Sequence, residues 1–491
     1  MRGPELENIE FTNIRRLLID LPTDHDADGE HRPTVGDVFA PEQHASALAP
    51  STLIVVGARG AGKSFWAGVL GQSDTRQLAA DVYPRLGLDR VTVQFGYNGF
   101  DTGAAVSRRT VEARTRDGDH DVALVFWQAV LLRSALAAVN DGEANLPISN
   151  FVEKYGDPED YEARLRGVDR QLDEKNLTCL IIFDALDTLS REWGQLTKLT
   201  DALFEACWML RARRRVRAKV FIRPDQLNDE SLKFVELPKL RSARVELDWS
   251  RSDLYGLLFT RMAEAEHGRD QDDFASLCRQ VGYAIPSSGA ERIRNWELAW
   301  SEEAQKRVFD RIAGRYMGRS PTKGATYPWT YKHLADGRDV VTPRSFLKLF
   351  VEAARQTQSL TTQVITAEAI RHGLREASKT RVEQLALEYP WIKRALAPLA
   401  GLKVPCPSSD IHESWRASET VEVISAAAER EGFLPPYQKS TSDNREDDLE
   451  AAMMRIGVLS YRNDGRADMP DLFRIASRML KLGGVALKGR K

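Results

Sequence analysis

The sequence predicts an α/β protein whose parallel sheet is covered by helices on both faces, followed by a helical region and a smaller C-terminal domain. Short apolar strands alternate with helix-length segments through the first half of the chain, which is typical of a parallel sheet. One of these strands runs directly into a glycine-rich loop. With 491 residues, of which 42% are hydrophobic and 29% charged, the chain is expected to form two or three folded units.

Residues 1–50 are expected to form an N-terminal arm and linker. Within them, Ile9–Leu21 has amphipathic spacing, Pro22–Thr34 is acidic and contains proline, and Val35–Leu48 leads into the first strand. Residues 51–250 are expected to form the α/β core, 251–400 a helical lid region and 401–491 a domain that resembles a winged helix.

The strongest motif is a strand, a glycine loop and a helix in direct succession. Thr52–Val56 is apolar and partly β-branched, Gly57–Ser64 has the spacing GxxxxGKS, and Phe65–Leu70 is apolar again. This is the P-loop, in which backbone N–H groups surround phosphates, a lysine reaches the terminal phosphates and a hydroxyl binds magnesium. The residues expected to bind the nucleotide are Gly57, Gly60, Gly62, Lys63 and Ser64.

A second apolar strand, Leu177–Phe183, ends in Asp184 and is followed three residues later by Asp187. A carboxylate at the tip of such a strand is placed to hold magnesium through water, which makes Asp184 the metal candidate beside Ser64. Asp187 is the candidate to orient or deprotonate an attacking water. The alternative for Asp187 is the cap of a helix that begins near Thr188 or Leu189.

Three further strands complete the predicted sheet: Val91–Phe95, Ala218–Ile222 and Ala243–Leu247. Parallel sheets bind ligands at the carboxyl ends of their strands, so Arg223, directly after one strand, is expected beside the phosphates. Between them, Val122–Val139 is expected to be a buried helix, and Pro158–Lys175 a charged, solvated insertion.

The charge balance excludes a general polycation, because 69 Lys and Arg face 71 Asp and Glu, a net charge of -2. The densest basic segment, Arg211–Lys219, has six basic residues in nine positions. It could bind an acidic partner, phosphate or a neighbouring subunit, or it could complement the dipole of its own helix end. A trans-acting arginine from Arg315 or Arg319 is a further alternative.

These motifs resemble those of additional-strand P-loop ATPases of the AAA+ and STAND type, with a likeness to the KAP branch, over residues 51–356. Phe183–Asp187 is similar to the Walker B motif of STAND proteins, and Phe221–Pro224 resembles the strand with their sensor-one arginine. Val341–Leu347 resembles the head of their lid helix, which makes Arg344 the sensor-two candidate for the γ-phosphate. The resemblance implies ATP and Mg²⁺ as ligands and ATP hydrolysis as the activity.

One position departs from the resemblance. Ala185 follows Asp184 where AAA+ motors usually carry glutamate, so slow, switch-like hydrolysis by a nucleoside triphosphatase is expected.

Residues 401–491 start with the proline-bearing segment Val404–Pro407, which is expected to be a linker at the beginning of a new domain. Two segments with helical spacing, Thr420–Glu431 and Asp447–Ile456, precede a predicted hairpin that turns at Asp464-Gly465. Helices followed by a hairpin suggest a winged helix. From Arg462 to Lys491 there are eight basic and three acidic residues, so this region is the candidate for DNA contact.

Three functions remain open. The first is an oligomerising ATP-dependent switch, as found in bacterial conflict and phage-defence systems, with a separate effector or partner protein. The second is a DNA-binding ATPase of the loader type, and the third is a nucleotide-gated adaptor with little hydrolysis. The four dispersed cysteines, with no CxxC pair, and the lack of a signal-peptide pattern favour a cytoplasmic protein without a membrane segment.

Overall fold

The computed structural model describes residues 9–23, 32–99, 105–116, 119–190, 192–228, 232–265, 268–357, 362–436 and 444–481. The chain divides into two units by its contacts. The sheet unit comprises His25–Asp248 and Ser288–Arg294, and the helical unit comprises Met1–Asp24, Trp249–Ser287 and Asn295–Lys491.

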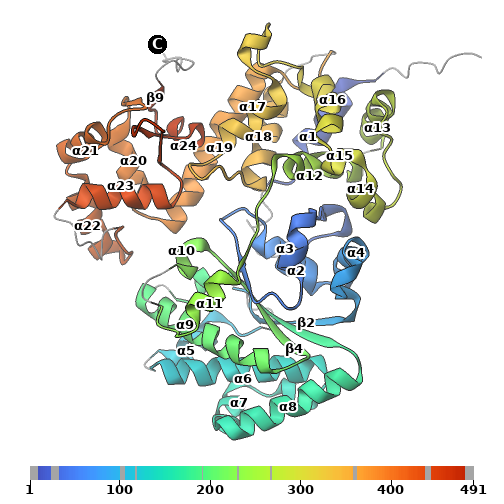
Figure 1. Cartoon of the computed structure of the whole chain (residues 1–491), viewed down its shortest axis with the longest axis vertical. Coiled ribbons are helices and arrows are strands. Elements are labelled where there is room, and N and C mark those ends of the chain that lie inside the picture. Colours follow the sequence, from blue (N-terminus) through green and yellow to red (C-terminus); the bar gives the residue numbers. More distant parts are fainter. Residues whose placement is uncertain are drawn as a thin grey trace, which may run out of the picture. The chain divides into compact units, whose positions relative to one another are not determined.

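The sheet unit contains five strands in the order β2-β3-β4-β1-β5, and each neighbouring pair is parallel (Figure 1). The strands are β1 (Ile54–Val56), β2 (Val91–Tyr97), β3 (Thr178–Phe183), β4 (Val216–Ile222) and β5 (Val245–Glu246). All five predicted strands are present, so the predicted parallel α/β fold is confirmed.

Strand β4 lies between the P-loop strand β1 and the acidic strand β3, with Val55 opposite Phe221 and Ile182 opposite Lys219. It is therefore an additional strand between the two motifs, as in the ATPases that the sequence resembles. Because the strands are parallel, the residues that follow β1, β3 and β4 meet at one edge of the sheet.

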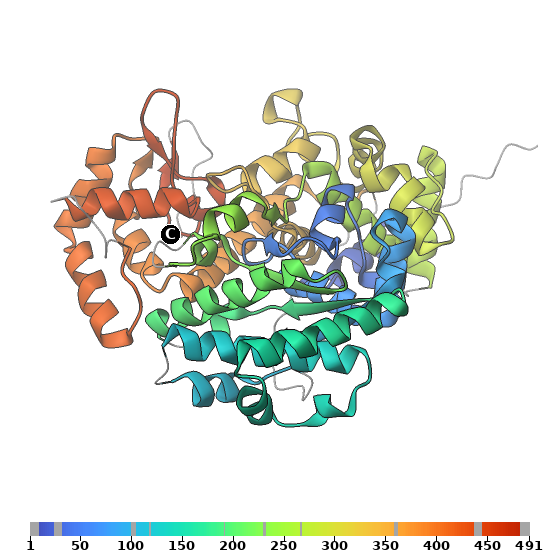
Figure 2. The ribbon, with the colours of Figure 1, turned by 60° about the horizontal axis from the view of Figure 1, so that its bottom comes forward.

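Side chains alternate between two hydrophobic cores on the opposite faces of the sheet. Ile181 and Phe183 belong to one core, and Leu180 and Ile182 belong to the other. Figures 1 and 2 show the two layers of helices. The first core is covered by α6 (His120–Ala138), α8 (Pro158–Glu174) and α9 (Trp193–Met209), and the second by α2 (Ala45–Leu48), α3 (Lys63–Gly71) and α4 (Ser73–Val82).

Helix α6 is long and apolar enough to cross a membrane by length and composition, and no other helix in the described ranges is. Its side chains Phe126, Trp127 and Leu131 are buried in the first core, where α6 packs against α9 and α8. It is the core helix that the sequence predicts.

Helix α8 corrects one expectation. It is not a solvated insertion, because Tyr161, Leu165, Val168 and Leu172 are buried in the first core. Their spacing places them on one face of the helix, so the charged residues occupy only the opposite face.

The basic segment 211–219 lies at the amino end of β4, opposite the edge at which the P-loop lies. Lys219 is fully buried, and its Nζ donates hydrogen bonds to the carbonyl oxygens of Ala47 at 2.6 Å, Ala49 at 2.9 Å and Thr52 at 2.8 Å. Burial lowers the pKa of Lys219 to about 7. Its ammonium group thus joins the end of α2 to the start of the P-loop strand, and it takes no part in a surface patch.

The helical unit combines helices that precede the sheet unit in the sequence with helices that follow it. Its first helix, α1 (Phe11–Ile19), buries Ile14, Leu17 and Leu18 and packs against α13 (Arg269–Val281) and α18 (Pro343–Gln356). The expected arm of residues 1–50 is therefore divided between the two units. Up to Glu388 this unit also contains α12 (Arg251–Glu264), α15 (Glu297–Trp300), α16 (Glu302–Ala313), α17 (Thr326–Leu334) and α19 (Ala367–Glu388).

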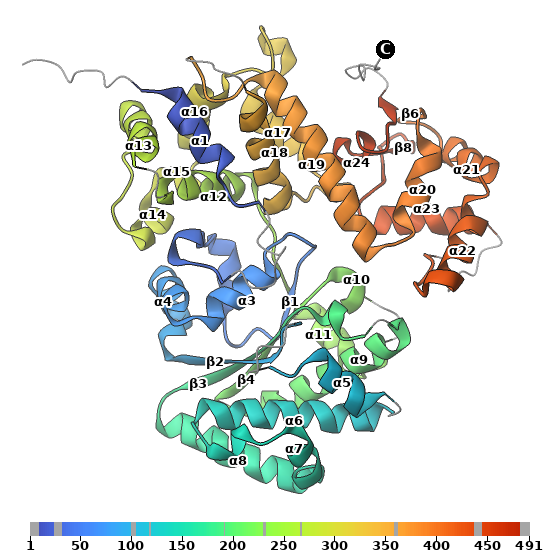
Figure 3. The same cartoon turned by 180° about the vertical axis from the view of Figure 1, so that it is seen from behind.

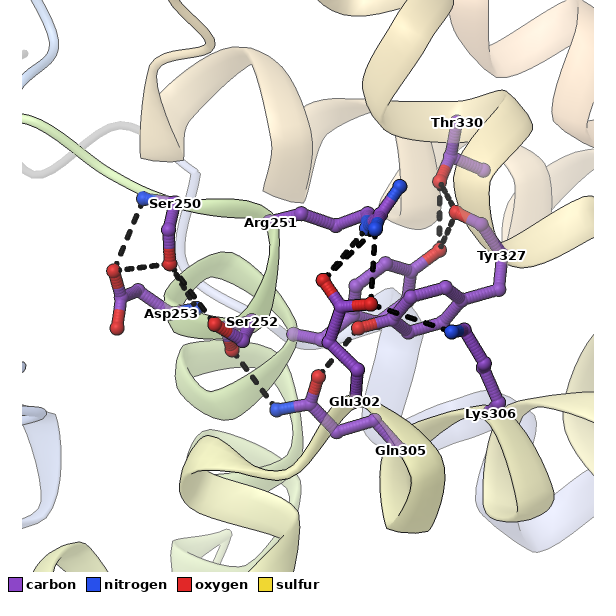
Figure 4. A network of polar contacts seen from close by, with 10 residues as sticks. Ser250, Arg251, Ser252, Asp253, Glu302, Gln305, Lys306, Tyr327 and Thr330 are labelled. Atoms are coloured by element: carbon purple, nitrogen blue, oxygen red, sulfur yellow. Dashed lines mark hydrogen bonds and ion pairs between the residues drawn. The ribbon is translucent and has the colours of Figure 1, made fainter.

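A polar network joins α12, α16 and α17 (Figure 4). Arg251 donates hydrogen bonds to both carboxylate oxygens of Glu302, each at 2.9 Å, and Gln305 donates to the carbonyl of Ser252 at 2.9 Å. The hydroxyl of Tyr327 donates to Gln305 at 2.6 Å, and the ring of Tyr327 stacks on that of Tyr255. These contacts fix α12, the first helix after the sheet unit, in the helical unit.

The C-terminal part of this unit contains α20 (Ile392–Leu396), α21 (Ser408–Ala417), α22 (Thr420–Glu431) and α23 (Arg445–Arg455). They are followed by an antiparallel hairpin of β7 (Ser460–Tyr461) and β8 (Ala467–Asp468), as predicted. The expected linker is ordered, because Val404 lies in β6 (Lys403–Val404), which pairs with β9 (Leu480–Lys481), and Cys406 bridges to Ala467. The basic tail at 482–491 lies outside the described residues.

Candidate nucleotide site

The glycine loop leaves β1 and turns into α3 at the carboxyl edge of the sheet. Gly62 precedes α3 with a φ of 102°, in the left-handed region that favours glycine. At Gly57, an added Cβ would lie 3.2 Å from both Ala61 and Lys63, so a side chain there would crowd the loop. The N–H of Gly57 donates to the carbonyl of Ile222 at 3.1 Å, which ties the loop to the end of β4.

Lys63, Ser64 and Asp184 come together at this edge. Nζ of Lys63 donates to the carbonyl oxygens of Gly57 at 2.7 Å and Ala58 at 3.3 Å. Asp184 is buried, and Ser64 and Lys63 both lie close enough to it to influence its ionisation. Burial raises the pKa of Asp184, and the opposing influences of the Ser64 hydroxyl and the charge of Lys63 do not cancel this effect.

The donor set fits magnesium. Oδ1 of Asp184 is buried and has no hydrogen-bond partner in the part of the chain that the structure describes, beside a serine hydroxyl and a phosphate-binding loop. Mg²⁺ prefers oxygen ligands and is commonly held by one or two carboxylates together with phosphate oxygens. Asp184 and Ser64 would supply the protein oxygens.

The turn after Asp184 is held in a specific conformation. Ala185 has a φ of 55° and lies in the left-handed region, which is unfavourable for alanine. The hydroxyl of Thr188 donates to the carbonyl of Ala185 at 2.8 Å, and Tyr97 at the end of β2 bonds the same hydroxyl at 2.8 Å. The methyl of Ala185 faces Gly99, where an added Cβ would lie 3.0 Å from it. Position 185 therefore directs its side chain toward the end of β2.

Asp187 lies in the 3₁₀ turn Leu186–Thr188 and is partly exposed. Helix α9 begins only at Trp193, with Glu192 at its N-cap, so the alternative of a capping role for Asp187 at a helix near Thr188 is wrong. Its carboxylate instead accepts a hydrogen bond from Nη1 of Arg223 at 3.3 Å.

Arg223 is held between two aspartates. Its Nε and Nη2 donate to the two carboxylate oxygens of Asp225, at 3.1 Å and 2.7 Å, while its third donor, Nη1, faces Asp187. The planar guanidinium and the bidentate pair fix the direction of Nη1. The side chain is only 10% exposed. Asp225 is thus part of the site, although the sequence analysis did not single it out. The sequence feature that could have indicated its role is its position two residues after Arg223, in the first turn of α10 (Pro224–Leu227).

The P-loop helix has its own buried support. Nε2 of His44 donates to the carbonyl of Asp248 at 2.8 Å, and Nδ1 accepts from the indole N–H of Trp66 in α3 at 3.2 Å. These two bonds specify the neutral tautomer with its proton on Nε2. Burial lowers the pKa of His44 to about 4, which keeps it neutral at physiological pH.

All but one of the predicted site residues belong to the sheet unit. Lys63, Ser64, Asp184, Asp187 and Arg223 lie in the sheet unit, at or after the carboxyl ends of β1, β3 and β4. Arg344 belongs to the helical unit, as the second residue of α18. Its role as a sensor stays a prediction.

No protein-family model matches this chain, and no curated protein is significantly similar to it in sequence. Among solved structures, it is similar to the Walker-type ATPase PABY2304 of Pyrococcus abyssi, with 12% identity, a TM-score of 0.38 and coverage of 94% of this chain and 98% of that one. It is also similar to the ORC2 protein of Aeropyrum pernix, solved as ADPNP–ADP complexes, with 11% identity, a TM-score of 0.37 and coverage of 87% and 86%. A third similar structure is that of Cdc6p from Pyrobaculum aerophilum, with 10% identity, a TM-score of 0.27 and coverage of 86% of this chain and 84% of that one.

The left-handed turn at Ala185 yields a stability test. Ala185→Gly is expected to raise the free energy of unfolding by about 0.5–1 kcal/mol, because glycine adopts this conformation without a Cβ penalty. Ala113→Gly, in the exposed face of α5 (Arg108–Thr115), is the matched control and should lower it by about 1 kcal/mol. Urea denaturation measures both. A loss of stability in both variants would contradict the strain at position 185.

The bidentate contact between Asp225 and Arg223 leads to a kinetic test. Asp225→Asn removes one charge and one acceptor of the bidentate pair, so we expect ATP turnover to fall roughly ten- to a hundredfold while ATP affinity changes little. Glu246→Gln, which alters the surface pair between Arg244 and the last residue of β5, should leave both turnover and affinity unchanged. Unaltered turnover in Asp225→Asn, measured beside nucleotide titration, would show that this aspartate does not position Arg223.

Proposed function

We propose that this chain binds Mg²⁺ and ATP at the carboxyl edge of its sheet and hydrolyses ATP as a molecular switch. The observation that carries the proposal is the buried carboxylate of Asp184, whose Oδ1 is unpartnered among the described residues and which lies close enough to Ser64 and Lys63 of the P-loop for both to influence its ionisation. A P-loop and an acidic strand tip brought together in this way are what nucleoside triphosphate binding requires. The choice of ATP follows from the resemblance to AAA+ and STAND ATPases.

Each residue has a role that its position supports. The loop N–H groups and Lys63 would bind the phosphates, while Ser64 and Asp184 would hold the metal, which neutralises charge on phosphate oxygens when bound. Asp187, exposed at the same edge, would orient the attacking water and accept its proton. Arg223 faces Asp187 and would hold that carboxylate in place until a phosphate competes for the guanidinium.

Slow turnover is the form of hydrolysis that this site favours. Residue 185 is alanine, so no carboxylate is available from that position, and Asp187 is already paired with Arg223. Such an enzyme would spend most of its time in one nucleotide state, which suits a switch that assembles with itself. A separate effector, a sensor role for Arg344 and a place in phage defence stay predictions from the resemblance.

The loader-type alternative receives less support from the C-terminal hairpin. Arg462 pairs with Asp468 at 2.8 Å, and Arg466 makes two bonds to Asp464, at 2.7 Å and 3.0 Å. The four charges compensate one another, so the hairpin offers no excess positive charge to a phosphate backbone.

The proposed function predicts two separable defects. Lys63→Ala should abolish ATP binding, whereas Asp187→Asn should keep binding and lose turnover by roughly a hundredfold or more. Nucleotide titration measures binding and phosphate release measures turnover, with Lys175→Ala as a control at an exposed lysine of the same unit.

The switch is tested by light scattering, which compares the mass of the protein without nucleotide, with ADP and with ATP. A folded Lys63→Ala protein with unchanged ATP affinity would refute the site, and a mass independent of nucleotide would refute the switch.

A further inference from the structure

The segment between α16 and α17, residues 314–325, forms a basic loop that projects from the helical unit (Figures 1 and 3). Tyr316 and Ala325 form an antiparallel bridge, and the N–H of Met317 donates to the carbonyl of Gly324 at 2.9 Å. A 3₁₀ turn, Pro321–Lys323, closes the tip. The loop is thus a short projection whose two arms are joined by a single antiparallel bridge.

The base of the loop is fixed. Met317 is fully buried, and its carbonyl accepts a hydrogen bond from Arg371 of α19. The N–H of Thr326, at the start of α17, donates to the carbonyl of Arg315 at 3.0 Å. The projection is therefore attached to two helices of the unit at its base, and only its tip is free to meet a partner.

The loop carries positive charge without compensation along the chain. Arg311 to Ala335 contains no Asp or Glu, whereas Arg311, Arg315, Arg319 and Lys323 recur at intervals of four residues and are all exposed. Arg319 and Lys323 make no side-chain hydrogen bond or ion pair with any described residue. Arg315 lies over the ring of Tyr316, 5.4 Å from its centre, and its charge acts on Asp310. The C-terminal hairpin differs in this respect, since its arginines are paired.

The side chains at the tip are polar as well as basic. Between Gly318 and Gly324 the exposed residues are Arg319, Pro321, Thr322 and Lys323, with Ser320 half-buried. The stem of Lys323 lies along Gly318, where an added Cβ would be 2.9 Å from its Cγ, so the stem is supported and the ammonium group lies beyond it. Protein interfaces depend on buried apolar and aromatic anchors, which this tip lacks, whereas nucleic-acid interfaces are polar and strongly positive.

We infer that the basic loop contacts the sugar–phosphate backbone of a nucleic-acid duplex. Exposed arginine, lysine, serine and threonine side chains are the usual donors to phosphate oxygens. Such contacts position the protein on the duplex without reading its sequence. The inference is independent of ATP hydrolysis, so nucleotide-free protein tests it.

The test is fluorescence anisotropy with labelled DNA and RNA duplexes of about 30 base pairs, at about 50 mM and about 200 mM salt. The wild-type protein should bind one of these duplexes, and the affinity should fall steeply with salt. The double variant Arg319→Ala/Lys323→Ala should bind roughly ten- to a hundredfold more weakly, and its slope of log affinity against log salt should be smaller by about 2.

Three comparisons make the test decisive. Arg462→Ala/Arg466→Ala, in the compensated hairpin, should bind as the wild type does, and so should a variant with alanine at Lys488, Arg490 and Lys491. Polyglutamate should not displace the duplex at equal charge. The inference is overturned if the wild type binds no duplex, if the loop variant keeps wild-type affinity and salt slope, if either comparison variant loses binding instead, or if polyglutamate displaces the duplex. Circular dichroism confirms that each variant folds.

Discussion

The position of β4 between β1 and β3 is the constraint on which the candidate site depends. It separates the P-loop strand from the acidic strand by one strand width and places Arg223 between their carboxyl ends. Ser64 still lies close enough to influence the ionisation of Asp184 across this space, because α3 begins directly at the end of the loop. The buried carboxylate is costly without a partner, and that cost is the physical reason to expect a cation there.

At the same edge of the sheet, further hydrogen bonds fix the positions of Asp187 and Arg223. Tyr97, Thr188 and the left-handed Ala185 fix the turn that presents Asp187, and Asp225 fixes the guanidinium that faces it. Each of these groups is held by hydrogen bonds within the sheet unit. The site is therefore largely pre-organised by the chain itself, which lowers the entropy lost when a nucleotide binds.

The sheet could be predicted because each strand is a short apolar run that ends in turn residues or a charged residue, and the P-loop has fixed spacing. The pairing of Arg223 with Asp225 could not, since a bidentate contact depends on rotamers at a strand end. Lys219 was assigned to a basic segment, because its burial depends on three carbonyl groups more than 160 positions earlier in the chain. Likewise, net charge from Arg462 onward did not show that the arginines of the hairpin are compensated by aspartates beside them.

The central claim is that Asp184, Ser64 and Lys63 form a site for a metal–nucleotide complex. Calorimetric titration of the wild-type protein with ATP, with Mg²⁺ and with EDTA in its place, tests it most directly. The account predicts a single site per chain whose affinity falls at least tenfold without Mg²⁺, because the Asp184 carboxylate would then face the phosphates without a cation. Equal affinity under both conditions, or no binding in either, would contradict it.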